Sequence, residues 1–258
     1  MGDRIASVGV ITSRSNPLIK DLAKYFRGRR DDARWVIVEG RKNVQDLMRR
    51  GLRPIRVVAT EETATSMTGD FPLTLVSGSI YQLFTTVRTP EGILAIFEAT
   101  PVSIEDLATS PRPLIYLHGV QDPGNIGAVI RVAAAFGAGG ILIGSGCASP
   151  YTPKVSRGSA GSLLITPFCF AQDDGALFDY LEKPRRLIAA VARGGCAPGS
   201  MVLPDNSVLL LGSEGGGLPE DILRRAHELV TIPTAGTVES LNVAVSAGIL
   251  MYAWFCRR

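Results

Sequence analysis

Three glycines and a carboxylate follow an apolar run in the segment Leu211-Gly-Ser-Glu-Gly-Gly-Gly-Leu218. Consecutive glycines allow positive φ angles and let a ligand approach the backbone closely. The segment is neither a dinucleotide fingerprint nor a Walker loop, because the sequence contains no GxGxxG and no GKS or GKT follows. Glu214 would repel a phosphate, so this loop favours a neutral or cationic ligand. A plain turn is the alternative interpretation.

A second polar segment runs from His118 to Gly127 and leads into an alanine-rich helix. Asn125 lies between two glycines, where we expect it to cap that helix. Arg131 follows six residues later, within two turns of the helix start. Because its neighbours are small, Arg131 is either a solvated surface charge or a cation placed for a ligand.

The third polar segment, residues 232–243, ends with Ser240 and Asn242, which open an otherwise apolar helix. Ser240 is placed to cap that helix. Asn242 falls inside the first turn, where a structural explanation for an amide is weaker. A small-residue loop before a capped helix is common, so this segment indicates a functional site only in combination with the other two.

Apolar runs and helical patterns alternate along the chain, which is typical of α/β proteins. In the first part we predict strands at 35–38, 55–59, 73–76 and 92–97, with helices at 16–30, 43–50 and 80–84. In the second part we predict strands at 114–117, 140–143, 187–191, 208–211 and 229–232, with helices at 126–136, 154–162, 219–226 and 240–256. Continuous apolar strands separated by helices indicate a parallel sheet covered on both faces.

These patterns divide the chain into three parts. We predict a compact α/β domain over residues 1–98, a proline-containing linker over 99–113 and a larger domain over 114–258. Ligands of parallel sheets bind at the carboxyl ends of the strands. Function is therefore expected in the loops that follow the strands, which include the three polar segments.

Charge is unevenly distributed along the chain. The 258 residues contain 27 Lys and Arg against 24 Asp and Glu, a formal charge of +3. Residues 1–56 hold 14 basic and 6 acidic side chains, a net of +8, which leaves −5 for the remainder. A basic head favours a polyanionic partner, although a solvated Arg-rich helix explains the count equally well. With 46% apolar and 20% charged residues, the chain is predicted to fold.

The sequence favours a cytoplasmic protein. Its first residues lack the apolar stretch of a signal peptide. The four cysteines form no CxxC pair and the chain has two histidines, so we expect reduced thiols and no metal site. Residues 240–256 carry no charge over 17 positions, the lower limit for spanning a bilayer; a buried or subunit-interface helix is favoured over a membrane span.

Taken together, the three polar segments resemble the motifs of the SpoU/TrmH group of RNA ribose 2′-O-methyltransferases, within the SPOUT superfamily. The first motif appears as Asn125-Ile-Gly-Ala-Val-Ile-Arg131, the second as Leu211-Gly-Ser-Glu-Gly-Gly-Gly-Leu218 and the third as Ser240-Leu-Asn-Val243. Residues 153–162 are similar to the family's basic, small-residue segment. The resemblance covers about residues 114–255, and residues 14–98 are more weakly similar to the RNA-binding α/β/α extension of many members.

The resemblance implies a parallel sheet whose C-terminal segment is threaded into a trefoil knot, with S-adenosylmethionine as the cofactor. It implies cofactor binding by Gly212, Ser213, Ile232, Leu241 and Val243. It implies catalytic roles for Asn125, Arg131, Glu214, Ser240 and Asn242, with Glu214 holding Asn125. A guanidinium ordinarily stays protonated, so Arg131 either polarises the ribose hydroxyl or contacts a neighbouring phosphate.

The resemblance also gives the basic head an RNA partner. Phosphate contacts are expected from Arg14, Lys20, Lys24, Arg27, Arg29, Arg30 and Arg41. Ribosomal RNA is preferred over transfer RNA, because the extension resembles a ribosomal-protein fold; housekeeping and antibiotic-resistance members share this layout. A homodimer through the knotted domain is expected, with Leu250, Met251, Trp254 and Phe255 either at its interface or in a monomer core. A non-catalytic RNA-binding protein and a nucleotide-dependent oxidoreductase are the alternatives, the latter disfavoured by the missing fingerprint.

Overall fold

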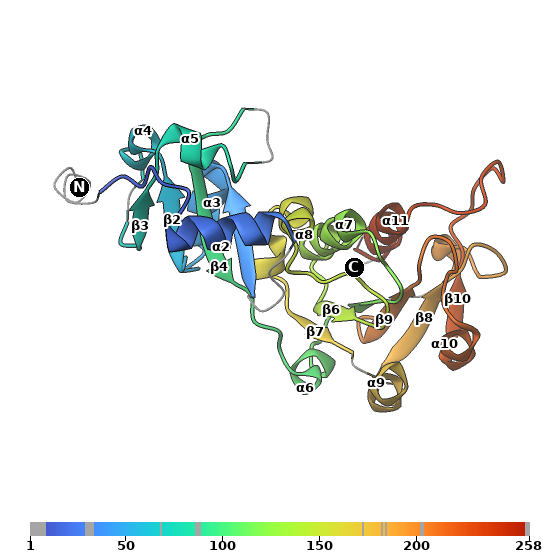
Figure 1. The fold of residues 1–258 in the computed structure, drawn as a ribbon. Coiled ribbons are helices and arrows are strands. Elements are labelled where there is room, and N and C mark those ends of the chain that lie inside the picture. The colour runs from blue at the N-terminus through green and yellow to red at the C-terminus, as the bar shows by residue number, and fades with distance from the viewer. Residues whose placement is uncertain are drawn as a thin grey trace. The chain divides into compact units, whose positions relative to one another are not determined.

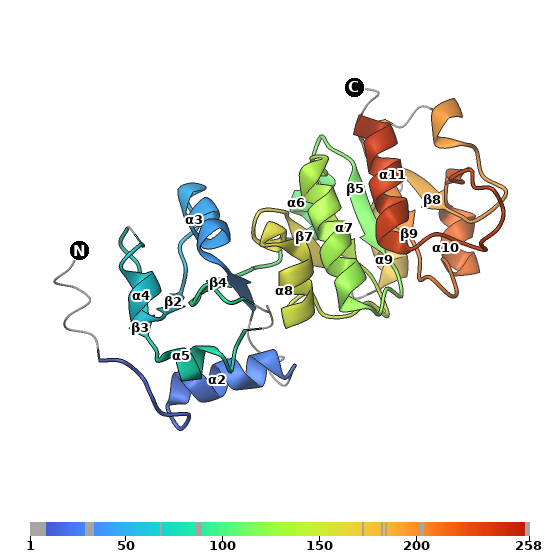
Figure 2. The same cartoon turned by 90° about the horizontal axis from the view of Figure 1, so that it is seen from above.

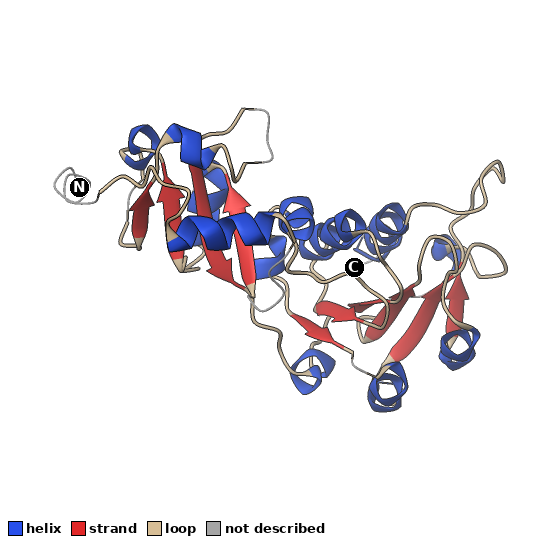
Figure 3. Cartoon of the chain, in the orientation of Figure 1, coloured by secondary structure: helices blue, strands red, loops and turns tan. Residues whose placement is uncertain are grey.

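The computed structural model describes residues 9–28, 34–67, 69–85, 89–171, 173–181, 183, 185–201 and 204–255. Backbone contacts divide the chain into two compact units. The first consists of Met1–Thr100 with Tyr151–Leu164, and the second of Pro101–Pro150 with Ile165–Arg258. Each unit contains one β-sheet, drawn in red in Figure 3.

The first unit is built on a mixed four-stranded sheet with the order β1-β4-β2-β3. Its strands are β1 (Trp35–Glu39), β2 (Arg56–Ala59), β3 (Leu73–Leu75) and β4 (Ile93–Glu98). Strand β4 is antiparallel to both of its neighbours, whereas β2 and β3 run parallel. Apolar side chains of the strands bury against helices, as the uncharged runs in the sequence predict.

Helices cover this first sheet. They are α2 (Pro17–Phe26), α3 (Arg41–Arg49), α4 (Glu61–Ala64) and α5 (Gly78–Tyr81). Asn16 caps α2, because its side-chain oxygen accepts the Leu18 N–H at 3.0 Å. The apolar face of α2 buries Ile19 and Leu22 in a cluster that includes Ile80 of α5.

The segment Tyr151–Leu164 belongs to the first unit by its contacts, although the sequence places it within residues 114–258. It holds α8 (Pro153–Ser159) and the short 3₁₀ helix η1 (Ser162–Leu164). Helix α8 packs against β1, and its Ser156 hydroxyl donates a 2.5 Å hydrogen bond to the Ile37 carbonyl. Sequence pattern locates this helix but does not reveal which sheet it contacts.

The second unit contains a six-stranded sheet with the order β10-β8-β9-β5-β6-β7, and every pair of neighbours is parallel. The strands are β5 (Leu114–Leu117), β6 (Gly140–Ile143), β7 (Phe168–Phe170), β8 (Arg186–Ala190), β9 (Ser207–Leu211) and β10 (Glu228–Val230). An α/β fold with a parallel sheet is thereby confirmed. Strand β7 was not predicted, because this edge strand has three residues and is too short to give a periodic signal.

Helices lie on both faces of this second sheet (Figure 1). On one face α7 (Pro123–Ala135) and α11 (Val243–Phe255) pack side by side, as Figure 2 also shows. On the other face lie α6 (Ile104–Ala108), α9 (Asp174–Leu181) and α10 (Glu220–Arg225). The 3₁₀ helix η2 (Pro198–Ser200) precedes β9. The predicted linker therefore contains a helix, and Leu107 of α6 is buried in the core.

The uncharged C-terminal helix is largely a core element. Leu250, Met251 and Trp254 are all buried within the chain, so the monomer-core alternative is correct for them, and the Phe255 side chain lies outside the described residues. The outward side of α11 instead exposes Val245, Ile249 and Tyr252. Among the described residues, no helix is long and apolar enough to cross a membrane.

Candidate functional site

The three polar segments follow strands β5, β9 and β10, whose carboxyl ends point to the same edge of the sheet. One side chain from each segment enters a single hydrogen-bonded network. Glu214 Oε1 accepts 2.6 Å hydrogen bonds from the Nδ2 atoms of both Asn125 and Asn242. Asn242 Nδ2 also lies 3.0 Å from Asn125 Oδ1. The contact expected between Glu214 and Asn125 is thus present.

Both predicted helix caps were wrong. Helix α7 begins at Pro123, and its cap is Asp122, whose Oδ1 accepts the Gly124 N–H at 2.8 Å. Asn125 consequently lies inside the first turn, and its amide is available to the network. Ser240 does not cap α11, because that helix begins three residues further on.

Asn242 caps α11 instead. Its Oδ1 accepts the N–H groups of Ala244 at 2.9 Å and Val245 at 3.3 Å. The Nδ2 group of the same side chain donates to the network. One amide therefore fixes the start of α11 and joins it to the glycine loop.

A cavity of about 370 Å³ lies beside the network. Its lining includes every residue predicted to bind the cofactor, namely Gly212, Ser213, Ile232, Leu241 and Val243. Ser240 lines it as well. The two charged side chains in the lining, Glu214 and Glu239, are both acidic. This lining suits a neutral or cationic ligand, as the glycine loop predicts.

Gly212 is required by the shape of the loop. A Cβ at this position would lie 2.1 Å from the carbonyl carbon of Gly217. The loop is closed by a pair of backbone hydrogen bonds, since Ser213 N–H donates to Gly217 O at 3.1 Å and Gly217 N–H donates to Ser213 O at 2.9 Å. The glycines therefore let the backbone fold back on itself at the cavity wall.

A second cavity of about 300 Å³ shares part of this wall. It is lined by residues 119–122 and Asn125 on one side and by residues 213–215 on the other. The network of Asn125 and Glu214 thus borders both cavities.

Arg131 is the predicted catalytic residue that the structure leaves apart. It lies on the exposed surface of α7 and lines neither cavity. Within the described part of the chain, it makes no hydrogen bond or ion pair. Six residues after Asn125, its side chain points about 120° around the helix from that amide.

The predicted RNA-binding residues lie on the first unit. Arg14, Lys20, Lys24, Arg27 and Arg41 are exposed, whereas Arg29 and Arg30 lie outside the described residues. Lys20 and Lys24 are on α2, and Arg27 follows its last turn. Lys24 Nζ is 3.9 Å from Asp21 Oδ1, a weak surface pair that leaves the ammonium open to a phosphate.

Several residues that line the first cavity were not predicted as site residues; they include residues 190–192 at the end of β8 and the two polar side chains Thr234 and Glu239. Both lie in the loop that joins β10 to α11, between Ile232 and Ser240. Both belong to the third polar segment, and this position in the sequence could have identified them as candidate site residues. No group of three or more His, Cys, Asp or Glu side chains suited to a metal ion is found among the residues that the structure describes.

The fold and the site together define a parallel α/β protein with a ligand cavity at the carboxyl ends of its strands. The sequence profile of the SpoU rRNA Methylase family matches residues 112–252. An uncharacterized tRNA/rRNA methyltransferase from Synechocystis is 30% identical over 269 aligned positions, which cover 96% of this chain and 93% of that protein. The chain therefore belongs to the SpoU rRNA methylase family, as its three motifs predict.

Two further relatives refine this assignment. A 23S rRNA (adenosine(1067)-2′-O)-methyltransferase from Streptomyces laurentii is 29% identical, with 96% of each chain covered. The crystal structure of an AdoMet-bound rRNA methyltransferase from Sinorhizobium meliloti is 27% identical and matches with a TM-score of 0.85, covering 97% of this chain and 98% of that one. The predictions of an RNA methyltransferase and of S-adenosylmethionine as its cofactor are confirmed at the level of the family.

Proposed function

We propose that this protein transfers the methyl group of S-adenosylmethionine to a ribose 2′-hydroxyl of ribosomal RNA. The observation that carries the proposal is the meeting of Asn125, Glu214 and Asn242, one from each family motif, beside a cavity lined by all five predicted cofactor residues. The Streptomyces laurentii relative acts on the 2′-oxygen of 23S rRNA, which supports the substrate class.

The cavity fits the cofactor by its chemistry. S-adenosylmethionine, when bound, supplies a methyl group on a positively charged sulfonium and carries no phosphate. The lining offers backbone groups of the glycine loop, apolar side chains such as Leu241, and the carboxylates of Glu214 and Glu239. A phosphate-bearing ligand would meet repulsion at the same place.

We assign the network a positioning role in methyl transfer. Glu214, which borders both cavities, fixes the amides of Asn125 and Asn242 through one carboxylate oxygen, so Asn125 is held at the wall of the second cavity. A fixed geometry between acceptor hydroxyl and methyl donor contributes a large part of the rate gain in such reactions. Ser240 completes the cofactor wall.

Arg131 is assigned to the RNA. Its guanidinium stays protonated at neutral pH and is exposed, which suits a phosphate next to the target ribose. We expect Arg131→Ala to retain S-adenosylmethionine binding and to lose methyl transfer, and Arg131→Lys to recover only part of it.

Labelled methyl transfer to an unmodified 23S rRNA transcript tests the proposed function. Incorporation into the 2′-O position of one nucleotide is the expected result. Cofactor binding measured by calorimetry without any incorporation into ribosomal or transfer RNA would support the alternative, a non-catalytic RNA-binding protein. Mapping of 2′-O-methyl sites in total RNA with and without the protein identifies the nucleotide.

The domain roles follow from the same proposal. Residues 1–98 would recruit RNA through exposed basic side chains, and residues 114–258 would carry the reaction. The C-terminal segment would form the trefoil knot of the family; β10 pairs at one edge of the sheet, and the chain then returns to α11, which packs against α7. An experimental structure whose trace from β8 to α11 passes through no loop would contradict the knot. A cytoplasmic location stays a prediction, which imaging of the tagged protein in cells would test.

A homodimer is the remaining part of the proposal. Val245, Ile249 and Tyr252 are 50%, 38% and 59% exposed and recur at helical spacing on α11, which supports burial against a second copy. Light scattering is expected to show a dimer for the native protein and a monomer for Ile249→Asp. Ile55→Asp, at a similarly exposed position of the first unit, serves as the control and is expected to remain dimeric.

A further inference from the structure

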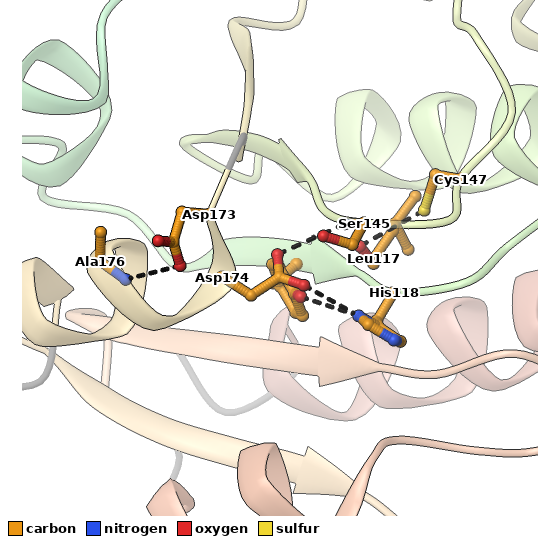
Figure 4. Close-up of polar contacts among 8 residues, drawn as sticks. Leu117, His118, Ser145, Cys147, Asp173, Asp174 and Ala176 are labelled. Carbon is orange, nitrogen blue, oxygen red and sulfur yellow. Dashed lines mark hydrogen bonds and ion pairs between the residues drawn. The ribbon is translucent and has the colours of Figure 1, made fainter.

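A polar cluster separate from the proposed catalytic residues lies in the loops after β5, β6 and β7. His118 comes directly after β5, Ser145 lies in the loop after β6, and Asp174 is the first residue of α9. The three strands are neighbours in a parallel sheet, so their carboxyl ends bring these residues together. Figure 4 shows the Asp174 carboxylate directed toward both His118 and Ser145.

The Asp174 carboxylate accepts from three donors. Its Oδ2 lies 3.2 Å from His118 Nδ1, and its Oδ1 accepts the Ser145 backbone N–H at 3.3 Å. The buried Tyr116 hydroxyl is hydrogen-bonded to the same carboxylate. Burial, followed by this hydrogen bond and the negative charge of Asp174, raises the pKa of Tyr116, so the phenol keeps its proton.

These contacts assign the tautomer of His118. Nδ1 is 3.2 Å from a carboxylate oxygen and 3.1 Å from the Tyr116 oxygen. Because a carboxylate only accepts, Nδ1 carries the hydrogen that it donates to Asp174. The side chains of His118 and Asp174 are 21% and 16% exposed, which shields their contact from water. The ring is thereby held in one orientation.

This pair holds the first residues of the loop that leads to Asn125. The His118 N–H donates to Leu211 O at 2.9 Å, and the Gly119 N–H donates to Ser145 O at 2.8 Å. Gly119 begins the lining of the second cavity, which ends at Asn125 on this side. In contrast, no residue between 118 and 148 is among the described residues that line the first cavity. Loss of the His118 side chain would therefore act first on the loop that ends at Asn125, because the backbone hydrogen bond from residue 118 to Leu211, which lines the first cavity, does not depend on that side chain.

We propose that His118 and Asp174 form a positioning pair for methyl transfer, which sets the loop of Asn125 relative to Glu214 from outside the cofactor cavity. The proposal rests on the proposed function. In this proposal neither residue touches the substrate, because both act by positioning the loop 118–125. Loss of the pair should therefore slow the reaction while leaving cofactor binding intact.

Steady-state kinetics on an unmodified 23S rRNA transcript test this proposal. We expect His118→Ala to lower kcat about 10- to 100-fold, as a displacement of about 1 Å in a reacting group does. The KM for RNA and the Kd for S-adenosylmethionine by calorimetry should stay within about twofold of the native values, because the His118 side chain lies outside the lining of the first cavity and the backbone hydrogen bond to Leu211 is kept. The matched control is His227→Ala, which changes the other histidine of the chain, directly before the edge strand β10 and three strands away from β5. It should keep native kcat.

A conservative variant separates positioning from direct proton transfer. In His118→Asn the amide Nδ2 takes the place of Nδ1 and still donates to Asp174, so kcat should return to within about threefold of the native value. Asp174→Asn places a donor against existing donors and should match His118→Ala. The double variant should be no slower than either single one, since the two residues act as a unit.

Each result decides between interpretations. Native kcat in His118→Ala, or equal losses of kcat and cofactor affinity, would overturn the positioning pair. Failure of His118→Asn alongside His118→Ala would also overturn it in favour of a direct role of Nε2. Absence of methyl transfer by the native protein to any RNA would instead reject the proposed function, which keeps the two failures distinct.

Discussion

Asn242 donates a 2.6 Å hydrogen bond to Glu214 Oε1, the same oxygen that receives the amide of Asn125. The Oδ1 atom of Asn242 meanwhile accepts the first free N–H groups of α11. A single side chain thus links the start of a buried helix to the glycine loop at the cavity wall. Because Glu214 is a carboxylate, the hydrogen bonds that it accepts from Asn125 and Asn242 are charge-assisted and roughly twice as strong as neutral ones.

Replacing Glu214 by Gln should weaken this link and slow methyl transfer. The amide oxygen of Gln can still accept, but the negative charge is lost, so each bond falls to the strength of a neutral one. We expect kcat to fall about tenfold, equivalent to about 1.4 kcal/mol, with the fold intact by circular dichroism. Glu220→Gln removes an exposed carboxylate from α10 and is the control. Equal turnover in the two variants would argue against a role for the network.

Replacing Gly212 by Ala should damage the cofactor cavity. The added Cβ would lie 2.1 Å from the Gly217 carbonyl carbon, so the loop must shift. Overpacking of this kind costs about 1–3 kcal/mol, which would correspond to a loss of binding affinity of about 5- to 150-fold. Calorimetry with S-adenosylmethionine measures it. Gly78→Ala on the first unit, which lines neither cavity, is the control, because a Cβ there meets no atom within 4 Å. Similar affinities of the two variants would contradict the requirement for glycine.

Much of the second unit was predictable from sequence because its strands are continuous apolar runs. Strands β5 and β6 match the predicted residues, and helix α10 lies within its predicted range. The helix starts were not predictable in the same way. Asp122, Asn125 and Asn242 are all good capping residues, and only the backbone geometry decides which of them caps a helix.

Most members of the candidate site, and the contact of Glu214 with Asn125, were predictable from residue type and the family resemblance, whereas Arg131 lies apart and the remaining contacts were not predicted. Residue type and spacing brought Glu214 and Asn242 to attention, whereas their shared oxygen depends on how three loops meet. The His118–Asp174 pair gave no sequence signal, because 56 residues separate its members and α9 itself was not predicted. Long-range pairs of this kind arise from the order of strands in the sheet, which periodicity does not encode.

Arg185 should be a strong determinant of stability. It is 3% exposed, and its guanidinium donates to the carbonyls of Leu107, Ala108, Ser110, Arg112 and Ser207. Burial lowers its pKa. The fork therefore satisfies the last carbonyl groups of α6 and the segment after it, which α6 itself leaves without partners.

Replacing Arg185 by Met would leave these carbonyls buried without donors. We expect the free energy of unfolding in urea to fall by about 3 kcal/mol, within the range for disrupting a buried polar network. The adjacent Arg186 provides the control. Its 2.6 Å pair with Glu228 is at the surface, where such a contact contributes about 0–1 kcal/mol, so Arg186→Met should change stability little. Equal effects at the two positions would show that the buried fork contributes nothing beyond surface charge.

The basic residues of α2 should control RNA affinity rather than turnover. Lys20, Lys24 and Arg27 are exposed on the first unit, and removing one phosphate interaction should reduce the slope of log K against log salt by about 0.7–0.9. Replacement of all three by Gln should therefore lower the slope by about 2 and raise the KM for a 23S rRNA transcript, with kcat unchanged at saturating RNA. We choose substitution over deletion of residues 1–98, because the deletion would also remove β1, against which α8 packs.

The control for this prediction is a triple replacement by Gln with the same change of charge on the second unit. Lys183, Arg186 and Arg224 are exposed there and were not predicted to contact RNA. If the basic head recruits RNA, the control keeps most of the native salt slope. If net charge alone attracts RNA, the two triple variants lose affinity equally, because long-range attraction depends on total charge more than on its location. Filter binding over a range of salt concentrations separates these outcomes and decides whether the +8 of residues 1–56 is a binding surface or a solvated face.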